Sequence, residues 1–146
     1  MTLRLADISD AEAIAIVHRA ARDAAMPWLP ALHTPEENVV FFRETVLPKS
    51  DVWLVEAGGV AAFIAMTPGW IDHLYVSPSH WRRGMGASLL EFAKGRHAAL
   101  ELWTFQRNQR ARNFYERFGF SVAQTTNGAG NEEHEPDMRY VWQGGA

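Results

Sequence analysis

The sequence predicts a single α/β domain with a hairpin, a parallel pair of strands and flanking helices. The chain has 146 residues, of which 47% are hydrophobic, enough for one core and too few for two comparable domains. We therefore expect one domain over residues 1–146. Apolar residues follow helical spacing before Pro48 and strand-like runs after Asp51. A helical stretch then separates the runs Trp70–Val76 and Leu100–Phe105, so these two strands are expected to be parallel.

The first element with a clear start signal is a helix. Ser9 is followed three residues later by Glu12, which is a capping-box pattern, and alanine, isoleucine and valine recur on one helical face behind it. We expect this helix from about Asp10 to Ala25. The segment Met26–His33 carries two prolines and is expected to be an irregular connector.

A second helix is predicted directly after the connector. Thr34 and Glu37 repeat the capping box, and Pro35 stands at the first helical position, where proline is favoured. Because a proline disfavours helical geometry in the residue before it, this helix is expected to end before Pro48.

Strands and tight turns dominate the middle of the chain. The runs Val52–Val55 and Val60–Met66 flank Gly58-Gly59 and indicate a hairpin. Trp70–Val76 is the next strand, and a helix with its inner face at Gly86, Leu89, Leu90 and Ala93 follows.

The last helix has signals at both ends. Asn108 can cap its start, and Gly119 suits the left-handed position after its end. Phe120–Ala123 and Met138–Trp142 are expected to be strands, separated by the polar loop Thr125–Asp137.

Composition excludes several classes of protein. The chain has no cysteine, so disulfides, thiolate metal sites and a cysteine nucleophile are impossible. The longest apolar run, Val60–Met66, is far below the roughly 20 residues that cross a bilayer. We expect a soluble, cytoplasmic protein that does not bind membranes.

Charge is unevenly distributed along the chain. The net charge is −3, which argues against nucleic-acid binding. The segment from Arg82 to Arg117 nevertheless contains eight basic and three acidic residues. This segment is suited to an anion, although basic residues on solvated helix faces would give the same pattern.

The stretch from Leu74 to Leu90 carries the most specific chemical signal. A strand ends, a basic turn follows, and Gly84 and Gly86 open a helix, where backbone N–H groups and the helix dipole favour a phosphate. The dinucleotide fingerprint is excluded because position 89 is leucine, and the P-loop because no Gly-Lys-Ser/Thr occurs. The two glycines are also compatible with a simple tight turn.

Two motifs together resemble the GCN5-related N-acetyltransferase (GNAT) family. The first is the strand, Val-x-Pro, basic turn, Gly-x-Gly and helix just described. The second, about two dozen residues later, is Asn-x-x-Ala-x-x-x-Tyr-x-x-x-Gly-Phe, which appears here from Asn108 through Tyr115 to Phe120. One position departs from the family pattern, because Trp81 stands where glutamine or arginine is usual.

The resemblance implies a GNAT-type fold, with a mixed, mostly antiparallel sheet, a splayed parallel pair of central strands and flanking helices. It also implies that the protein binds acetyl-CoA as co-substrate, without a metal. The pantetheine arm would pair with backbone groups between the splayed strands, and the pyrophosphate would lie on the glycine loop. The residues expected to bind acetyl-CoA are Leu74, Val76, Arg82, Arg83, Gly84, Met85, Gly86, Ala87 and Asn108.

The resemblance also assigns a role to Tyr115. Helical spacing alone favours a core tyrosine at Tyr115. Its position in the family motif implies the general acid that protonates the departing thiolate of coenzyme A, and a backbone N–H near Leu74 would hold the oxyanion.

A base must deprotonate the acceptor amine, which is mostly an ammonium at neutral pH. Asp72 and His73 lie on the strand expected to line the cleft, with opposite side-chain directions. We choose Asp72 as the base, with His73 or a water chain as competitors and a plain solvent-facing aspartate as the alternative.

The acceptor pocket is expected between two loops. Glu133 and its acidic neighbours, with Trp28 and His33 from the connector, would form its rim and attract a cationic amine. The acidic cluster from Glu132 to Asp137 matches no zinc spacing, and a solvated loop is its simplest interpretation.

The predicted function is therefore transfer of an acetyl group from acetyl-CoA to a primary amine of a small molecule or peptide, by direct attack in a ternary complex. The alternative is a noncatalytic CoA-binding sensor or interaction module, which would need Gly84 and Gly86 but not Tyr115. The sequence is also compatible with a homodimer. The acceptor itself is chosen by loops whose shape the sequence does not determine.

Overall fold

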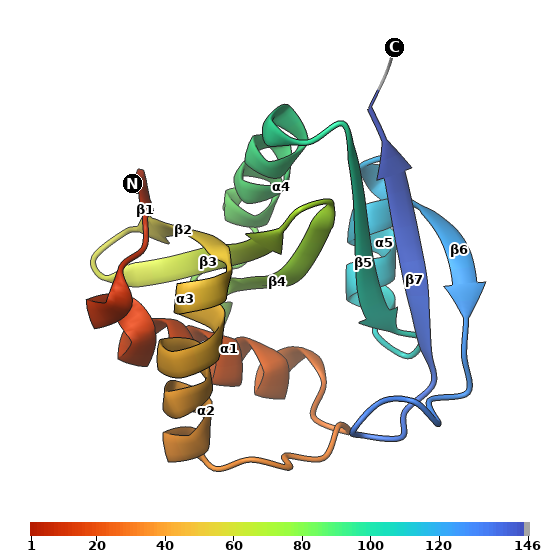
Figure 1. The fold of residues 1–146 in the computed structure, drawn as a ribbon, viewed down its shortest axis with the longest axis horizontal. Coiled ribbons are helices and arrows are strands. Elements are labelled where there is room, and N and C mark those ends of the chain that lie inside the picture. Colours follow the sequence, from red (N-terminus) through yellow and green to blue (C-terminus); the bar gives the residue numbers. More distant parts are fainter. Residues whose placement is uncertain (145–146) are drawn as a thin grey trace.

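The computed structural model describes residues 1–144, which form a seven-stranded sheet flanked by helices (Figure 1). The strands are β1 (Thr2–Leu5), β2 (Asp51–Glu56), β3 (Val60–Thr67), β4 (Trp70–Val76), β5 (Ala99–Phe105), β6 (Ser121–Thr125) and β7 (Asp137–Gln143). The helices are α1 (Ala11–Ala25), α2 (Pro35–Phe41), α3 (Leu47–Lys49), α4 (Met85–Arg96) and α5 (Gln109–Arg117). Short 3₁₀ turns η1 (Ile8–Asp10) and η3 (Pro78–His80) and a π-helical turn η2 (Phe42–Val46) complete the elements.

The sheet is mixed and mostly antiparallel, as the sequence predicts. Its strand order is β1-β2-β3-β4-β5-β7-β6, and β4–β5 is the parallel pair. The predicted hairpin is present as β2 and β3, joined at Gly58-Gly59. The chain therefore folds as an α/β domain with the expected parallel pair at the centre of its sheet.

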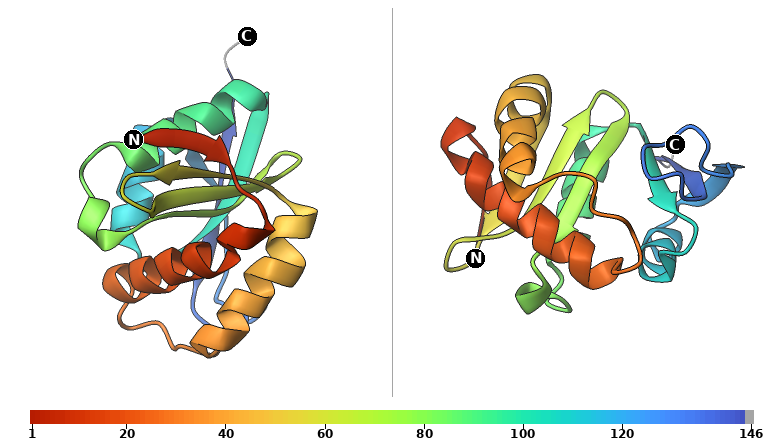
Figure 2. Two further views of the ribbon diagram at one scale, coloured as in Figure 1. Left: turned by 90° about the vertical axis from the view of Figure 1, so that its left-hand side faces the viewer. Right: turned by 90° about the horizontal axis from the view of Figure 1, so that it is seen from below.

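Two apolar cores lie on opposite faces of the sheet. Helices α1 and α2 cover one face of the β2–β4 half, and α4 covers the other (Figure 2). The larger core joins α4 and α5 through residues such as Leu90 and Tyr115, whereas the smaller core is centred on Ile14, Phe42 and Phe63. Strand β4 lies between these cores and is fixed by both.

The start of α1 differs from the prediction by a few residues. The capping box is formed by Asp7 and Asp10 around η1, not by Ser9 and Glu12. Asp10 accepts the Asp7 N–H at 2.9 Å and also binds the guanidinium of Arg4 at 2.8 and 2.9 Å. This second partner from β1 favours Asp10 over Glu12, and the sequence pattern does not reveal it.

The prediction that the second helix ends before Pro48 is wrong. Thr34 and Glu37 do cap α2 as expected, but the helical path continues through η2 into α3, and Leu47 keeps helical dihedral angles. In η2 the Leu47 N–H donates to Phe42 O, five residues back. This wider turn displaces the carbonyls that would clash with a proline ring.

Helix α5 begins and ends where the sequence indicates. The Asn108 side chain accepts a hydrogen bond from Ala111 N at 3.2 Å, and Gly119 has a φ of +91°, in the left-handed region that favours glycine. Both caps fix the register of α5 and therefore the direction of its side chains.

Candidate active site

Strands β4 and β5 separate soon after they pair. Their register is limited to Trp70 opposite Glu101, next to a hydrogen bond of 2.9 Å from Glu101 N to Gly69 O. Beyond this point the two strands diverge toward their carboxyl ends (Figure 1). The predicted splay is present, and it leaves one edge of β4 without a strand partner.

The register of β4 shows which backbone groups face that opening. Ser77 N donates to Ala61 O at 2.8 Å, in continuation of the antiparallel pairing between β3 and β4. Because hydrogen-bonded and non-hydrogen-bonded pairs alternate in such a ladder, the N–H and C=O groups of Leu74 and Val76 point away from β3. Val76 O accepts the indole N–H of Trp81, and the other three groups are placed where an extended ligand with amides could pair.

A glycine loop follows β4 and leads into α4. Arg82 and Gly84 have φ values of +65° and +79°, and Gly84 is the residue before the first turn of α4. Alternation of left-handed residues turns successive N–H groups toward one side, which makes an anion-binding concavity. The 12-residue helix α4 adds the positive end of its dipole to this concavity.

One cavity of about 610 Å³ connects the loop to the splayed strands. Of the residues expected to bind acetyl-CoA, it brings together all but Arg83, and Tyr115 also lines it. Arg110 and Arg117 from α5 join Arg82 in its wall, so three of the eight cations in the basic segment face it. Neither arginine belongs to the two family motifs, although their place behind the Asn108 cap could have indicated them.

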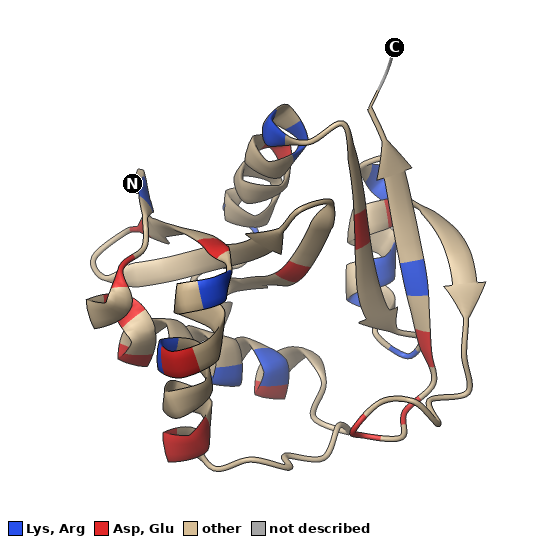
Figure 3. Ribbon diagram, viewed as in Figure 1, with Lys and Arg blue, Asp and Glu red and all other residues tan. Residues whose placement is uncertain are grey.

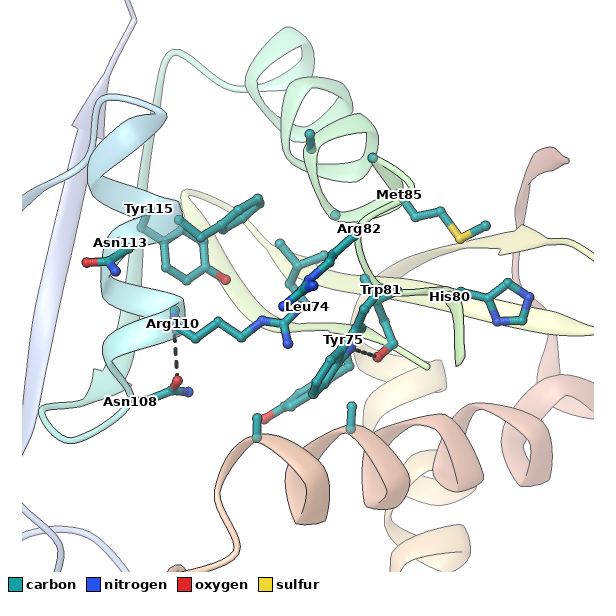
Figure 4. A pocket seen from close by; sticks show the side chains of 18 of the residues that line it. Leu74, Tyr75, His80, Trp81, Arg82, Met85, Asn108, Arg110, Asn113 and Tyr115 are labelled. Carbon is teal, nitrogen blue, oxygen red and sulfur yellow. Dashed lines mark hydrogen bonds between the residues drawn. The ribbon is translucent and has the colours of Figure 1, made fainter. Parts of the chain in front are cut away.

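Trp81, the departure from the family pattern, has a specific place in the cavity wall. Its indole Nε1 donates to Val76 O at 2.8 Å. The guanidinium of Arg110 lies 3.5 Å from the centre of its ring, so these two residues connect the loop to α5 across the cavity (Figure 4). Trp81 therefore anchors the glycine loop to the end of β4.

Tyr115 presents its hydroxyl to the cavity from α5 (Figure 4). Its ring is buried, 5.1 Å from Phe114 and 5.6 Å from Phe120 between ring centroids. Burial raises the pKa of Tyr115 far above its ordinary value, so the phenol stays protonated. A protonated phenol in this position can donate a hydrogen bond or a proton.

Asn108 combines its capping role with a place in the same wall. Its side-chain oxygen is used by Ala111 N, whereas no hydrogen bond engages its Nδ2 within residues 1–144. The amide therefore keeps a donor for a ligand.

Asp72 is placed away from the cavity, contrary to the expectation that it faces the cleft. In the pairing of β4 with β3, Ile71 lies opposite Met66 and His73 lies opposite Ala65. Asp72 has no partner between them and is therefore the extra residue of a β-bulge. Its exposed carboxylate accepts from Thr67 Oγ1 at 2.8 Å. The bulge breaks the strict alternation on which that expectation depended.

His73 lies in an aromatic cluster on the α1 side of β4. Its ring centroid is 5.4 Å from Phe42 and 5.8 Å from His18. Burial lowers the pKa of His73 to about 4 and that of His18 to about 3. Both imidazoles are therefore neutral at physiological pH.

The three residues expected at the acceptor rim do not line the cavity, but each lies where the connector approaches the β6–β7 loop (Figure 1). The guanidinium of Arg107 lies over the ring of Trp28, 4.0 Å from the ring centre. Arg107 also donates two hydrogen bonds to Glu135. His33 contacts Glu132 at 2.7 Å, and Glu133 lies 3.8 Å from Arg22. These contacts join the two loops.

Two carboxylates of the acidic loop, Glu133 and Glu135, are paired with arginines of the chain itself. Red positions on the β6–β7 loop lie close to the connector and to the basic end of α1 in Figure 3. Within residues 1–144, no group of three or more histidine or acidic side chains is arranged to hold a metal ion. In the same residues, no helix combines the length and the hydropathy needed to cross a membrane.

Comparisons with known proteins agree with this geometry. The family model for the acetyltransferase (GNAT) domain matches residues 48–122. The peptidyl-lysine N-acetyltransferase YiaC of Escherichia coli is 33% identical over 82 residues, which are 55% of this chain and 56% of that protein. The match therefore spans about half the length of this relative.

Solved structures show the same fold over nearly the whole chain. The apo form of YjaB from Escherichia coli has a TM-score of 0.82 at 20% identity and covers 99% of this chain and 98% of its own. The PaiA N-acetyltransferase from Thermoplasma acidophilum, in complex with coenzyme A, has a TM-score of 0.76 at 17% identity, covering 98% of this chain and 99% of its own. The family model matches half of the chain, and the structure has the splayed strands and the glycine loop. This chain therefore belongs to the GNAT acetyltransferase family.

Proposed function

We propose that this protein is an acetyl-CoA-dependent N-acetyltransferase that acts on a primary amine. The observation that carries the proposal is the single cavity that joins a cationic glycine loop, unpaired backbone groups of β4 and the Tyr115 hydroxyl. The glycine loop suits the diphosphate of the donor, the β4 backbone groups suit its amide-bearing arm, and the Tyr115 hydroxyl suits its leaving thiolate. The family relationship supports the same activity.

The donor substrate would bind along β4. Its pantetheine amides would pair with the backbone of Leu74 and with the N–H of Val76, whose oxygen accepts from Trp81, and Asn108 Nδ2 would donate to the same arm. The pyrophosphate would receive backbone N–H bonds from the loop through Gly84 to Ala87, with Arg82 and Arg110 supplying positive charge. Arg83 lies outside the cavity wall, and we assign it at most a long-range electrostatic contribution.

The transfer itself needs an acid on the sulfur side. After the amine attacks the thioester carbonyl, a backbone N–H near Leu74 would stabilise the oxyanion. Tyr115 would then protonate the thiolate as the carbon–sulfur bond breaks. Its raised pKa keeps the proton available over the working pH range.

The acceptor class follows from the loops and from one relative. The YiaC relative is named a peptidyl-lysine N-acetyltransferase, so we include the lysine amine of a peptide beside small-molecule amines. Arginine pairing of Glu133 and Glu135 leaves less free negative charge at the rim, which argues for recognition of one amine and not of a strongly cationic surface.

A thiol-release assay over a panel of amines and lysine peptides tests the proposal, with CoA affinity measured by calorimetry. We expect saturable CoA binding and acetyl-CoA turnover with at least one acceptor. CoA binding without turnover for any acceptor would favour the noncatalytic module, and no binding would contradict the assignment of the cavity.

A further inference from the structure

Trp81 connects three parts of the cavity wall. It follows the short turn η3 and precedes the glycine loop, and its side chain folds back so that Nε1 donates to Val76 O at 2.8 Å. The guanidinium of Arg110 lies over the indole, 3.5 Å from the ring centre. Both residues line the cavity. One side chain therefore joins the end of β4, the glycine loop and the first turn of α5.

The contact between Trp81 and Arg110 crosses the cavity. Trp81 belongs to the wall made by β4 and the glycine loop, whereas Arg110 projects from α5 on the other side (Figure 4). A donor bound along β4 would extend between these two walls. It would therefore lie against this pair of side chains on its way in and out.

Arg110 is held at this place although its surroundings oppose a cation. Burial lowers the pKa of Arg110, and the positive charge of Arg82 lowers it further. Within residues 1–144, neither Arg82 nor Arg110 forms a salt bridge with a carboxylate. The face of an indole attracts a cation, so the ring of Trp81 offsets part of this repulsion.

The three side chains make an anion site that exists before the anion binds. Figure 4 shows the Arg82 and Arg110 side chains close to each other and to the Trp81 ring. A flexible arginine loses side-chain entropy when a ligand orders it, and earlier ordering reduces this cost. Two like charges held together also gain most from an anion that carries two phosphates.

We propose that Trp81 is a positioning residue for the donor substrate, whose ring holds the Arg110 guanidinium across the cavity beside the bound diphosphate and thereby slows the release of coenzyme A. This role deepens the proposed function and rests on it, because the ligand is the donor of that reaction. Glutamine, which is usual at this position in the family pattern, has no ring on which a guanidinium could lie. The departure at position 81 is therefore a feature of donor binding in this chain.

The test is a double-variant cycle on CoA binding. It compares the wild type, Trp81→Leu, Arg110→Met and the variant with both changes, and it adds Trp81→Phe, which keeps a ring but lacks the indole N–H. Trp103→Leu is the matched control, because Trp103 lies on β5 outside the cavity wall and is 44% exposed.

Three quantities are measured for every variant. The release rate comes from stopped-flow displacement of CoA labelled with a fluorophore on its adenine, with unlabelled CoA in excess. Calorimetry gives the dissociation constant of CoA over a series of salt concentrations. The melting temperature shows whether the fold is retained.

We expect Trp81→Leu to raise the release rate of CoA about tenfold, as for a lost cation–π contact in a partly desolvated site. Arg110→Met should raise it by a similar factor. Because Trp81 acts through Arg110, the double variant should release CoA about 10–30 times faster than the wild type, and not about 100 times faster. Trp81→Phe should raise the rate about threefold, because phenylalanine keeps a weaker contact with the cation. Trp103→Leu should match the wild type.

The salt series separates this role from simple packing. A side chain that only packs would change CoA affinity by the same factor at every salt concentration. Loss of a positioned cation should instead make the dissociation constant less dependent on salt. Trp81→Leu should therefore approach the salt dependence of Arg110→Met.

Two results would overturn the positioning role and leave the proposed function intact. One is a wild-type release rate in both Trp81→Leu and Trp81→Phe, and the other is a double variant in which the two single effects multiply. Should Trp81→Leu fail to fold, the same cycle with Trp81→Phe is judged by the same criterion. A wild-type protein that binds no CoA would contradict the proposed function together with this role.

Discussion

Tyr115 shows how the local environment changes the chemistry of one side chain. An exposed phenol would be surrounded by water and by other proton donors, whereas Tyr115 is packed among Phe114, Phe120 and Tyr140 with its hydroxyl in the cavity. Burial raises its pKa, so the hydroxyl remains a donor. The motif predicts this residue from sequence, but its surroundings required the structure.

Replacement of Tyr115 by phenylalanine removes the hydroxyl and keeps the ring packing. We expect kcat to fall by about 100-fold or more, while CoA affinity and melting temperature remain close to those of the wild type. Steady-state kinetics and calorimetry on the same preparation measure both quantities. An equal loss of kcat and CoA affinity would make Tyr115 a structural residue.

Arginines of the basic segment should differ in importance according to where they point. Arg110 lines the cavity over Trp81, whereas Arg83 is exposed and absent from the cavity wall. Arg110→Met should weaken CoA binding about tenfold at low salt, the loss expected for one charge-assisted phosphate contact. Arg83→Met is the control and should change the dissociation constant by less than about twofold, and the reverse order would refute the cavity assignment.

At the scale of elements, two predictions based on local signals were confirmed. The β2–β3 hairpin depends on two adjacent glycines, and the start of α5 depends on one asparagine cap; both signals lie within the segment that they define. The predicted helix end before Pro48 failed although its signal is local, because a π-helical turn precedes the proline in the same helical segment. Two other failed predictions depend on contacts between distant segments. Arg4 selects Asp10 as a capping partner, and the bulge that turns Asp72 outward depends on the pairing of two strands.

The acceptor side was the least predictable part of the site for the same physical reason. The sequence indicates that Trp28, His33 and Glu133 lie in loops, but not which charge neutralises which. Their partners, Arg107, Glu132 and Arg22, are 79, 99 and 111 residues away along the chain, so no local pattern connects them. Arg110 and Tyr75 were missed because helical and strand positions alone do not show that they share a cavity.

The β6–β7 loop offers a direct test of how its backbone is fixed. Gly128 has a φ of +85°, and a Cβ there would lie 2.4 Å from the Glu135 carbonyl carbon. Gly128→Ala should therefore destabilise the fold by at least about 1–2 kcal/mol, the cost of a left-handed alanine before any clash. Gly130→Ala, where a Cβ would meet nothing within 4 Å, is the control. Similar urea midpoints for both variants would contradict this conformation of the loop.

At the scale of the whole molecule, β4 connects the two cores and the site. One side of the strand carries His73 and Tyr75 into the α1 core, and the other carries Leu74 and Val76 toward α4 and α5. Loss of packing on either side would displace the backbone groups proposed to bind the donor. Stability and activity are therefore expected to depend on the same strand.

The buried histidines give this stability a pH dependence. The pKa values of His18 and His73 are lowered to about 3 and about 4, whereas the unfolded chain protonates them near pH 6.5. Between pH 6.5 and 4 the unfolded state binds more protons, so the free energy of unfolding falls as pH decreases. Urea titrations should show a slope approaching about 1.4 kcal/mol per pH unit for each histidine. His73→Leu should reduce that slope, and a flat profile over this range would show that the imidazoles are not buried as described.

The central claim is that the opening between β4 and β5 is the binding site for coenzyme A. Titration of CoA into the isotopically labelled protein, followed by the backbone amide signals, tests it directly. Saturable shifts should be concentrated at Leu74, Val76, Gly84, Gly86 and Asn108, with little change along β1 and β6. Shifts that are absent at saturating CoA, or that gather on a different face of the sheet, would contradict the claim.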